Sequence, residues 1–370
     1  MAETGSQTDR AHFLDGIRGW AALMVVFSHL IVFFLSSTTP AYQGWYIGFI
    51  SDGNLAVFTF FVLSGFALSV GFLQTGKTSV ITALSLRRYL RLSIPVAVSA
   101  LLAYLLQKAH LFSNAEAGAA THNLWLETFY TFPPDLLSCL KFGLYDVFFG
   151  YDPQQSYNAV LWTMPIEFFG SFIVFSICAL TLHLEKKLLI LCAILAYMVA
   201  TKNIFYLSFI CGLFLAVHYS NPSERLSKIF SRLSPFALLF AVYYSASSLR
   251  GGAFGLPPIP RSDYLTLTAA SLIVFSASLD TPIRSFFENR FSRYLGSISF
   301  PLYLTHFLVM CSFSSFLMLE LPKKGIGALA SGNIILASSV LLCFLVAHYF
   351  RHIEAFAISS ARRFSDHLMR

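Results

Sequence analysis

The chain has 370 residues, of which 56% are hydrophobic and 12% charged, and its mean hydropathy is +0.67. Soluble domains are about 45–50% apolar and about 25% charged, so this composition excludes a soluble globule and indicates a surface largely covered by lipid. The net charge of +7 alone would also suit a nucleic-acid-binding protein, but the basic residues lie in short connectors between apolar runs. The sequence therefore predicts an integral membrane protein with no nucleic-acid partner.

Ten apolar runs are candidates for helices that cross about 30 Å of hydrocarbon. They lie near residues 20–36, 54–72, 93–108, 158–181, 188–201, 204–219, 234–249, 264–280, 297–318 and 327–350. The predicted fold is all-α, a polytopic transmembrane helical bundle of about ten spans. Its predicted parts are a cytoplasmic N-terminal segment at 1–19, a transmembrane domain at 20–350 and a basic cytoplasmic tail at 351–370.

The lysines and arginines test this segmentation independently of the apolar runs. Of the 25, 18 fall in one set of alternate connectors and seven in the other. Because cytoplasmic loops are enriched in these residues, the split predicts an even number of spans with both termini in the cytoplasm. The first eight residues lack the features of a signal peptide, so the first apolar run is expected to remain as a span.

Two further segments carry predictions of their own. The longest outer connector, 109–157, contains Trp125, Pro133 and Pro134 and is expected to fold as a cap over the outer mouth. Within it, residues 139–150 are amphipathic and are predicted to be re-entrant or interfacial. The six cysteines lie in or beside apolar segments without CxxC spacing, so we expect core residues and no metal.

Three ionisable residues lie inside predicted spans, where an unpaired charge costs several kcal/mol. His29 and His306 each lie about ten residues into a span counted from its cytoplasmic end, and Glu167 about ten counted from outside. All three are therefore predicted near the midplane, where they can share a polar cavity. Structural roles remain open for each: a backbone carbonyl as the partner of His29, an Arg or His for Glu167, and Ser297, Ser299 or Thr305 for His306.

Arg18 precedes His29 by eleven positions, which returns to nearly the same helix face about 16 Å further along. One face can therefore hold an anion at the membrane boundary and a base inside the membrane. The alternative is that Arg18 snorkels or pairs with Asp15, one turn before it.

A basic run, Arg87, Arg88 and Arg91, opens the third predicted span. It suits a positive-inside anchor. It also suits a phosphate clamp, because guanidinium groups bind phosphate bidentately and this spacing aims two of them at one site.

Five segments in order carry a family resemblance. They are LDGIRG at 14–19 with Ser28 and His29, FFVLSGF at 60–66, RRYLR at 87–91, LWTMPIEF at 161–168 and ISFPLYLTH at 298–306. Together they resemble the motifs of the acyltransferase 3 family of membrane-bound O-acyltransferases. The chain departs from the family pattern at 93–95, where Ser-Ile-Pro replaces a more proline-rich continuation.

The resemblance implies an acyl-CoA donor, commonly acetyl-CoA, and a hydroxyl-bearing acceptor such as a carbohydrate or another secreted or lipid-linked molecule. His29 is then the expected general base, Asp15 is expected to fix Arg18, and Glu167 is expected either to orient His29 or to bind acceptor hydroxyls. The expected cofactor-binding residues are Arg88 and Arg91 for the CoA phosphates, with Arg87 in support, and Arg18 near the mouth. Ser64 and His306 are assigned to substrate binding, and Ser64 is not expected to act as a nucleophile.

Two other classes of function fit the same residues. A proton-coupled secondary transporter would use His29, Glu167 and His306 at the midplane, although no internal repeat is detectable. A non-catalytic scaffold or sensor of acylated lipids would not need Arg88 or His29. The host membrane, plasma membrane or endomembrane, is not determined by the sequence.

Overall fold

The computed structural model describes residues 11–183, 193–194, 196–198 and 200–370. Within these ranges the regular structure is helical, apart from one isolated bridge between Ala253 and Leu256. The longer helices are α1 (His12–Phe27), α2 (Gly53–Thr75), α3 (Thr78–Lys108), α8 (Met164–His183), α10 (Ile204–Ser220), α11 (Glu224–Arg250), α12 (Asp263–Ser278), α14 (Arg290–Val309) and α16 (Ala328–Leu368). Shorter ones are α4 (Asn114–Thr121), α5 (Leu124–Glu127), α6 (Leu136–Lys141), α7 (Val147–Phe149), α13 (Pro282–Glu288) and α15 (Ser315–Lys323).

Three π-helices and five 3₁₀-helices complete the described elements. The π-helices are η1 (Ser28–Leu35), which continues α1, η5 (Phe142–Asp146), and η8 (Met310–Ser314), which joins α14 to α15. The 3₁₀-helices are η2 (Pro40–Gln43), η3 (Trp45–Ile47), η4 (Phe49–Ser51), η6 (Pro153–Gln155) and η7 (Ala159–Thr163). π-Helical turns inside α-helices are rare and occur frequently at functional sites. The positions of η1 and η8 therefore make the C-terminal ends of α1 and α14 candidate functional regions.

Helix length and composition support an integral membrane protein. In the described ranges, seven helical runs are long and apolar enough to cross a membrane, and an eighth results if α12 and α13, bent by 91°, form one span. The apolar helix α10 is shorter, with 17 residues. The predicted span at 188–201 lies mostly outside the described residues. The polytopic helical class is confirmed, whereas ten spans and the cytoplasmic position of both termini remain predictions.

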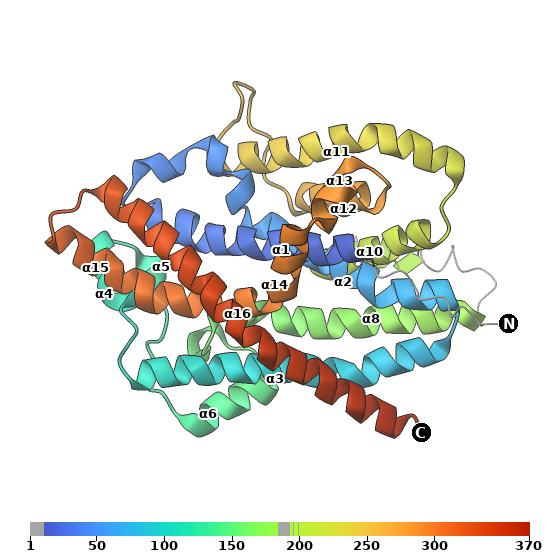
Figure 1. Cartoon of the computed structure of the whole chain (residues 1–370), viewed down its shortest axis with the longest axis horizontal. Helices are drawn as coiled ribbons and strands as arrows, with labels where there is room; N and C mark the ends of the chain where they lie inside the picture. The colour runs from blue at the N-terminus through green and yellow to red at the C-terminus, as the bar shows by residue number, and fades with distance from the viewer. Residues whose placement is uncertain (1–10, 184–192, 195, 199) are drawn as a thin grey trace.

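Two helices extend well beyond their predicted apolar segments. Helix α3 begins at Thr78 rather than near residue 93, so its three arginines lie within the helix. Helix α16 has 41 residues and includes almost all of the predicted tail. Figure 1 shows α16 crossing the molecule obliquely and packing on α3, which lies near the edge opposite α11. Hydropathy detects only the part of a helix suited to lipid, so it misses polar continuations such as these.

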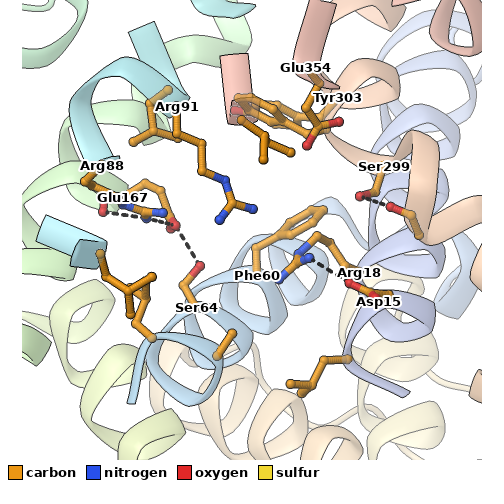
Figure 2. Close-up of a pocket in the computed structure, with 18 of the residues that line it drawn as sticks. Asp15, Arg18, Phe60, Ser64, Arg88, Arg91, Glu167, Ser299, Tyr303 and Glu354 are labelled. Atoms are coloured by element: carbon orange, nitrogen blue, oxygen red, sulfur yellow. Dashed lines mark hydrogen bonds and ion pairs between the residues drawn. The ribbon is translucent and has the colours of Figure 1, made fainter. Parts of the chain in front are cut away.

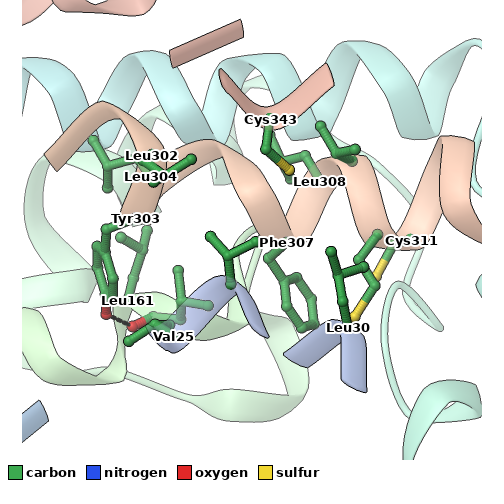
Figure 3. Packing of buried hydrophobic residues seen from close by; sticks show 14 of the residues in the cluster. Val25, Leu30, Leu161, Leu302, Tyr303, Leu304, Phe307, Leu308, Cys311 and Cys343 are labelled. Atoms are coloured by element: carbon green, nitrogen blue, oxygen red, sulfur yellow. Dashed lines mark hydrogen bonds between the residues drawn. The ribbon is translucent and has the colours of Figure 1, made fainter. Parts of the chain in front are cut away.

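Glycines bring α1 and α14 into close contact. A Cβ atom added to Gly19 would lie 2.4 Å from the backbone nitrogen of Gly296, and one added to Gly296 would lie 2.4 Å from the backbone oxygen of Asp15. Small residues permit such close approach of helices in membranes. Figure 3 shows apolar side chains of the two helices packed together beyond this contact, among them Val25 and Phe307.

The segment predicted to form the cap is folded and is bonded to the π-helices η1 and η8. Figure 1 shows α4 and α5 beside α15 at one end of the molecule. The Asn123 side chain donates to the backbone oxygen of Phe33 in η1 (2.7 Å), and the Ser113 backbone N–H donates to the oxygen of Cys311 in η8 (3.0 Å). The segment 139–150 forms parts of α6, η5 and α7, which pack on α3 and are too short to span a bilayer.

Candidate active site

A cavity of about 980 Å³ lies between α1, α2, α3, α8, α14 and α16. This volume is at the upper end of the range for small-molecule sites, about 300–1,000 Å³. Its polar wall includes most of the residues that the sequence predicts for the site: Asp15, Arg18, Ser64, Arg88, Arg91 and Glu167. Figure 2 shows these side chains converging on one space from different helices. Folding therefore brings together residues spread over about 150 positions of the sequence.

Glu167 joins three helices at the wall of this cavity. Its Oε1 atom accepts hydrogen bonds from Ser64 Oγ of α2 (2.7 Å) and from a guanidinium nitrogen of Arg88 of α3. Arg88 also donates to the backbone oxygen of Glu167 (3.2 Å) and is only 7% exposed. The prediction that Glu167 has a basic partner is thus met by Arg88. Because this carboxylate neutralises Arg88, that guanidinium is less available to a phosphate than the sequence suggested.

Arg91 lies one helical turn from Arg88 and extends into the open cavity (Figure 2). In the described part of the chain, no hydrogen bond or ion pair engages its guanidinium group. The carboxylates that act on its charge from a distance are Glu354 and Glu167. Arg18 stands across the cavity and is bonded to Asp15 (3.3 Å). An unpaired guanidinium facing open space is a ready site for an anion.

Helix α16 contributes a wall of the cavity that sequence reasoning missed. Arg351, His352 and Glu354 line it together with Ala355 and Ile358. These residues follow the last predicted span and were assigned to a cytoplasmic tail, so neither their helix nor its direction was foreseen. An amphipathic continuation of the helical pattern past residue 350 is the sequence signal that indicates it.

Arg87 points away from this cavity. Its guanidinium bonds to the hydroxyl of Ser365 (2.5 Å) and the carboxylate of Asp366 (2.8 Å), which ties α3 to the last turns of α16. Of the three arginines, Arg88 and Arg91 line the cavity and Arg87 joins two helices.

His29 and His306 form a second polar cluster, outside the lining of the cavity. His306 Nε2 lies 3.1 Å from His29 Nδ1, and each Nδ1 atom lies 3.0 Å from the backbone oxygen four residues earlier, Val25 for His29 and Leu302 for His306. His306 is 1% exposed and His29 is half-buried. The prediction that His29, Glu167 and His306 share one polar cavity holds only in part, because the two histidines meet while Glu167 lies in the wall of the separate cavity. Ser297, Ser299 and Thr305 do not bond to His306 in the described structure.

The bonds to the carbonyls assign both protons. A carbonyl oxygen only accepts, so His306 Nδ1 carries a proton and its Nε2 holds a lone pair in the neutral ring. That lone pair faces His29 Nδ1, so His29 Nδ1 carries a proton. This single N–H group donates to two acceptors, His306 Nε2 and the backbone oxygen of Val25. His29 Nε2 is left with a lone pair, and no hydrogen bond of the described residues uses it. The arrangement presents a neutral base with a fixed direction.

Tyr303 separates the cavity from the histidine pair. Its hydroxyl bonds to the Thr163 hydroxyl (2.6 Å) and to the backbone oxygen of Val160, both in η7. Its ring lines the cavity, and the ring centroid is 6.2 Å from that of His306. Sequence reasoning did not single out Tyr303, because a tyrosine among apolar residues is common in a helix core.

Comparisons with known proteins identify the family of the chain. A sequence profile described as an acyltransferase domain, Acyl_transf_3, matches residues 11–348. The chain belongs to the acyltransferase 3 family. An O-acetyltransferase of Phomopsis amygdali, PaAT-1, is 24% identical over 356 residues, which cover 80% of this chain and 71% of that protein. No solved structure matches the chain.

As a member of the acyltransferase 3 family with a relative named as an O-acetyltransferase, the protein is an O-acyltransferase. The carrier and the non-catalytic scaffold are therefore set aside. In the described residues, no group of three or more His, Cys, Asp or Glu side chains is placed to hold a metal ion.

Proposed function

We propose that this membrane O-acyltransferase moves an acyl group, with acetyl the expected one, from acyl-CoA to the hydroxyl of a carbohydrate or another small acceptor. The observation that carries the proposal is the geometry of His29, whose Nδ1 atom lies 3.0 Å from the oxygen of Val25 and 3.1 Å from His306 Nε2, so that Nε2 is assigned as the basic nitrogen. It lies beside a cavity whose wall holds an unpaired arginine, and the named relative is an O-acetyltransferase.

The donor is proposed to enter the arginine-lined cavity. Arg91 and Arg18 face its open space, and phosphate groups are the anions that guanidinium groups bind best. The narrow pantetheine arm would pass Tyr303 to bring the thioester to His29, a distance of about 16 Å along α1 from Arg18. Tyr303 is bonded to η7 and packs on Phe60 and His306, so the proposal requires its ring to rotate away from these contacts to open the path.

The acceptor is proposed to approach His29 from the cap. The ring of Trp125 stacks on those of His29 and Phe33, with centroid distances of 6.0 and 4.8 Å. Phe33 is 44% exposed, so this aromatic face is open at the side of His29 away from the donor cavity. Aromatic rings of this kind bind the apolar faces of sugars and of hydrophobic alcohols.

In the proposed reaction His29 Nε2 takes the proton of the acceptor hydroxyl while its oxygen attacks the thioester carbonyl. The carbon–sulfur bond then breaks, and the CoA thiolate takes the proton back from the imidazolium ion. General base catalysis is typically worth about 10²- to 10⁴-fold in rate. Glu167, bonded to Arg88 and Ser64, would keep Arg88 in the cavity wall rather than take part in proton transfer.

Replacing the base tests the proposal. We expect His29→Ala to lower the release of CoA thiol from acetyl-CoA by about 10²-fold or more, measured on purified protein with a panel of sugars, alkyl glycosides and long-chain alcohols as acceptors. The control is His218→Ala, because His218 packs against Phe230 and Phe275 away from the cavity. Turnover of His29→Ala near that of the wild type would refute the assignment.

A further inference from the structure

The contacts of His306 leave it no free ring nitrogen. Its Nδ1–H is used by the oxygen of Leu302 and its Nε2 lone pair by the Nδ1–H of His29, while the whole side chain is 1% exposed. A residue that binds substrate needs an unused donor or acceptor that faces the substrate. The sequence assigned His306 to substrate binding, but the geometry offers a different role.

We infer that His306 is a positioning residue, which fixes the tautomer and the ring orientation of His29 and stabilises the imidazolium ion formed during proton transfer. This inference rests on the proposed role of His29 as the base. It adds a second histidine to the catalytic machinery without any contact between that histidine and the substrates.

The tautomer follows from the two acceptors. If His29 carried its proton on Nε2, the lone pair of its Nδ1 would face the oxygen of Val25 and the lone pair of His306 Nε2. That arrangement loses two hydrogen bonds and places three lone pairs together inside a membrane-spanning helix, where unsatisfied polar groups are costly. The ring is therefore held with the basic nitrogen directed away from His306.

A neutral histidine suits this place better than a carboxylate. When His29 becomes protonated, its Nδ1–H bonds strengthen, because hydrogen bonds from a charged donor are stronger than neutral ones. Asp or Glu would stabilise the cation more, but a carboxylate next to a neutral ring inside the membrane would be an uncompensated charge before the reaction. His306 supplies an acceptor and adds no charge.

The contact between α1 and α14 places the rings of His29 and His306 at the same level. Gly19 of α1 contacts Gly296 of α14, and His29 and His306 each lie ten residues further along their helices. The two helices therefore run in the same direction, and the contact between the glycines sets the level at which the histidines meet. His29 is the second residue of η1, and η8 begins four residues after His306; each of these π-helices is bonded to the cap through a backbone carbonyl.

A pair of amide substitutions tests the inference. The side-chain amide of Gln in His306→Gln reaches the position of Nε2 and can accept from His29, whereas the shorter amide in His306→Asn reaches only the position of Nδ1. We expect kcat for CoA release from acetyl-CoA to fall about 10- to 100-fold in His306→Asn, as for loss of one hydrogen bond to a charged group, and to recover largely in His306→Gln. The KM for acetyl-CoA should be unchanged in both.

Each alternative outcome has a distinct meaning. Equal kcat values for the two variants, or a raised KM with kcat intact, would overturn the positioning role. If His29→Ala retains turnover, the proposed function itself fails; if His29→Ala is inactive while His306→Asn keeps full kcat, only the present inference fails. The double variant should be no slower than His29→Ala alone.

A measurement on the unaltered protein avoids any effect of substitution on folding. Diethyl pyrocarbonate acylates imidazole nitrogens that have an accessible lone pair. We expect mass spectrometry of the treated protein to show His29 modified and His306 unmodified. Modification of His306 at a rate equal to or above that of His29 would overturn the inference.

Discussion

Two buried ion pairs of this protein share helix α2 but differ in how completely their polar atoms are used. At the start of α2, Asp52 is 1% exposed and accepts from the Leu55 backbone N–H, from Arg261 and from Ser245. In the cavity wall, the Glu167 carboxylate receives Arg88 and Ser64 on one oxygen. The neighbouring Arg91 has no such partner in the described structure.

The difference separates structural from functional polar groups. The Asp52 cluster caps α2 and fastens the connector before α12, and its bonds use both carboxylate oxygens. The cavity cluster leaves a guanidinium group facing open space. A buried polar network in which every group has a partner stabilises the fold. A network beside a cavity that leaves one charged group without a partner is typical of a ligand-binding site.

The largest effect on stability is expected for Asp52→Ala. It leaves Arg261 and two other donors without their acceptor, and removal of one partner of a buried pair costs about 3–5 kcal/mol. Thermal unfolding in detergent measures the loss. The control is Asp366→Ala, since the Asp366 side chain is 53% exposed; equal losses from the two variants would remove the distinction between buried and exposed pairs.

Arg91→Ala should weaken the binding of CoA and leave the stability of the fold unchanged. Because Arg91 has no partner among the described residues, its loss should leave thermal unfolding without ligand unchanged. The affinity for CoA should fall by about 1.5–3 kcal/mol, the value of hydrogen bonds to charged groups, measured as reduced thermal stabilisation by CoA. Arg363→Ala, exposed on α16, is the control. A destabilised protein with intact CoA binding would assign Arg91 to the structural class.

Gly19→Ala addresses the histidine pair without touching either ion pair. The new methyl group would lie 2.4 Å from the Gly296 nitrogen, so α1 and α14 must separate, at a cost of about 1–3 kcal/mol. We expect kcat to fall as His29 and His306 move apart. Gly327→Ala is the control, because no atom lies within 4 Å of the position of its added Cβ atom and Gly327 does not line the cavity. Unchanged kcat in Gly19→Ala would show that the close helix contact is not needed.

The smallest effect is expected for Arg87→Ala. Its partner Asp366 is half-exposed, and exposed ion pairs contribute about 0–1 kcal/mol. The KM for acetyl-CoA should not change. A clear rise in that KM would restore the phosphate-binding role that the sequence predicted for Arg87.

The chemistry of the site was more predictable than its geometry. Ionisable residues in apolar segments are costly, so His29, Glu167 and His306 could be singled out from the sequence. Arg18 was indicated by its spacing from His29, and Arg88 by the basic run that opens the third predicted span. Their partners could not be singled out, because Glu167 meets Arg88 and His29 meets His306 across helices that periodicity does not relate.

Helix ends were the weaker part of the prediction of the fold. Apolar runs gave the correct class and most of the helices, but they placed the start of α3 near residue 93 and the end of α16 near residue 350. Both helices continue through charged residues that face the cavity or each other. Hydropathy measures how readily a segment transfers into lipid, so it does not detect the parts of a helix that are covered by other parts of the protein.

The length of α16 bears on how this enzyme should be handled. The family match ends at residue 348, yet the cavity wall continues to Ile358, and the ion pair that joins α16 to α3 involves Asp366. A truncation or a reporter fusion placed at the end of the family match would remove one side of the cavity and leave the apolar segments that insert into the membrane. Affinity tags therefore belong beyond the end of α16 at Leu368, and a shortened enzyme that inserts but is inactive would be an artefact of the boundary chosen.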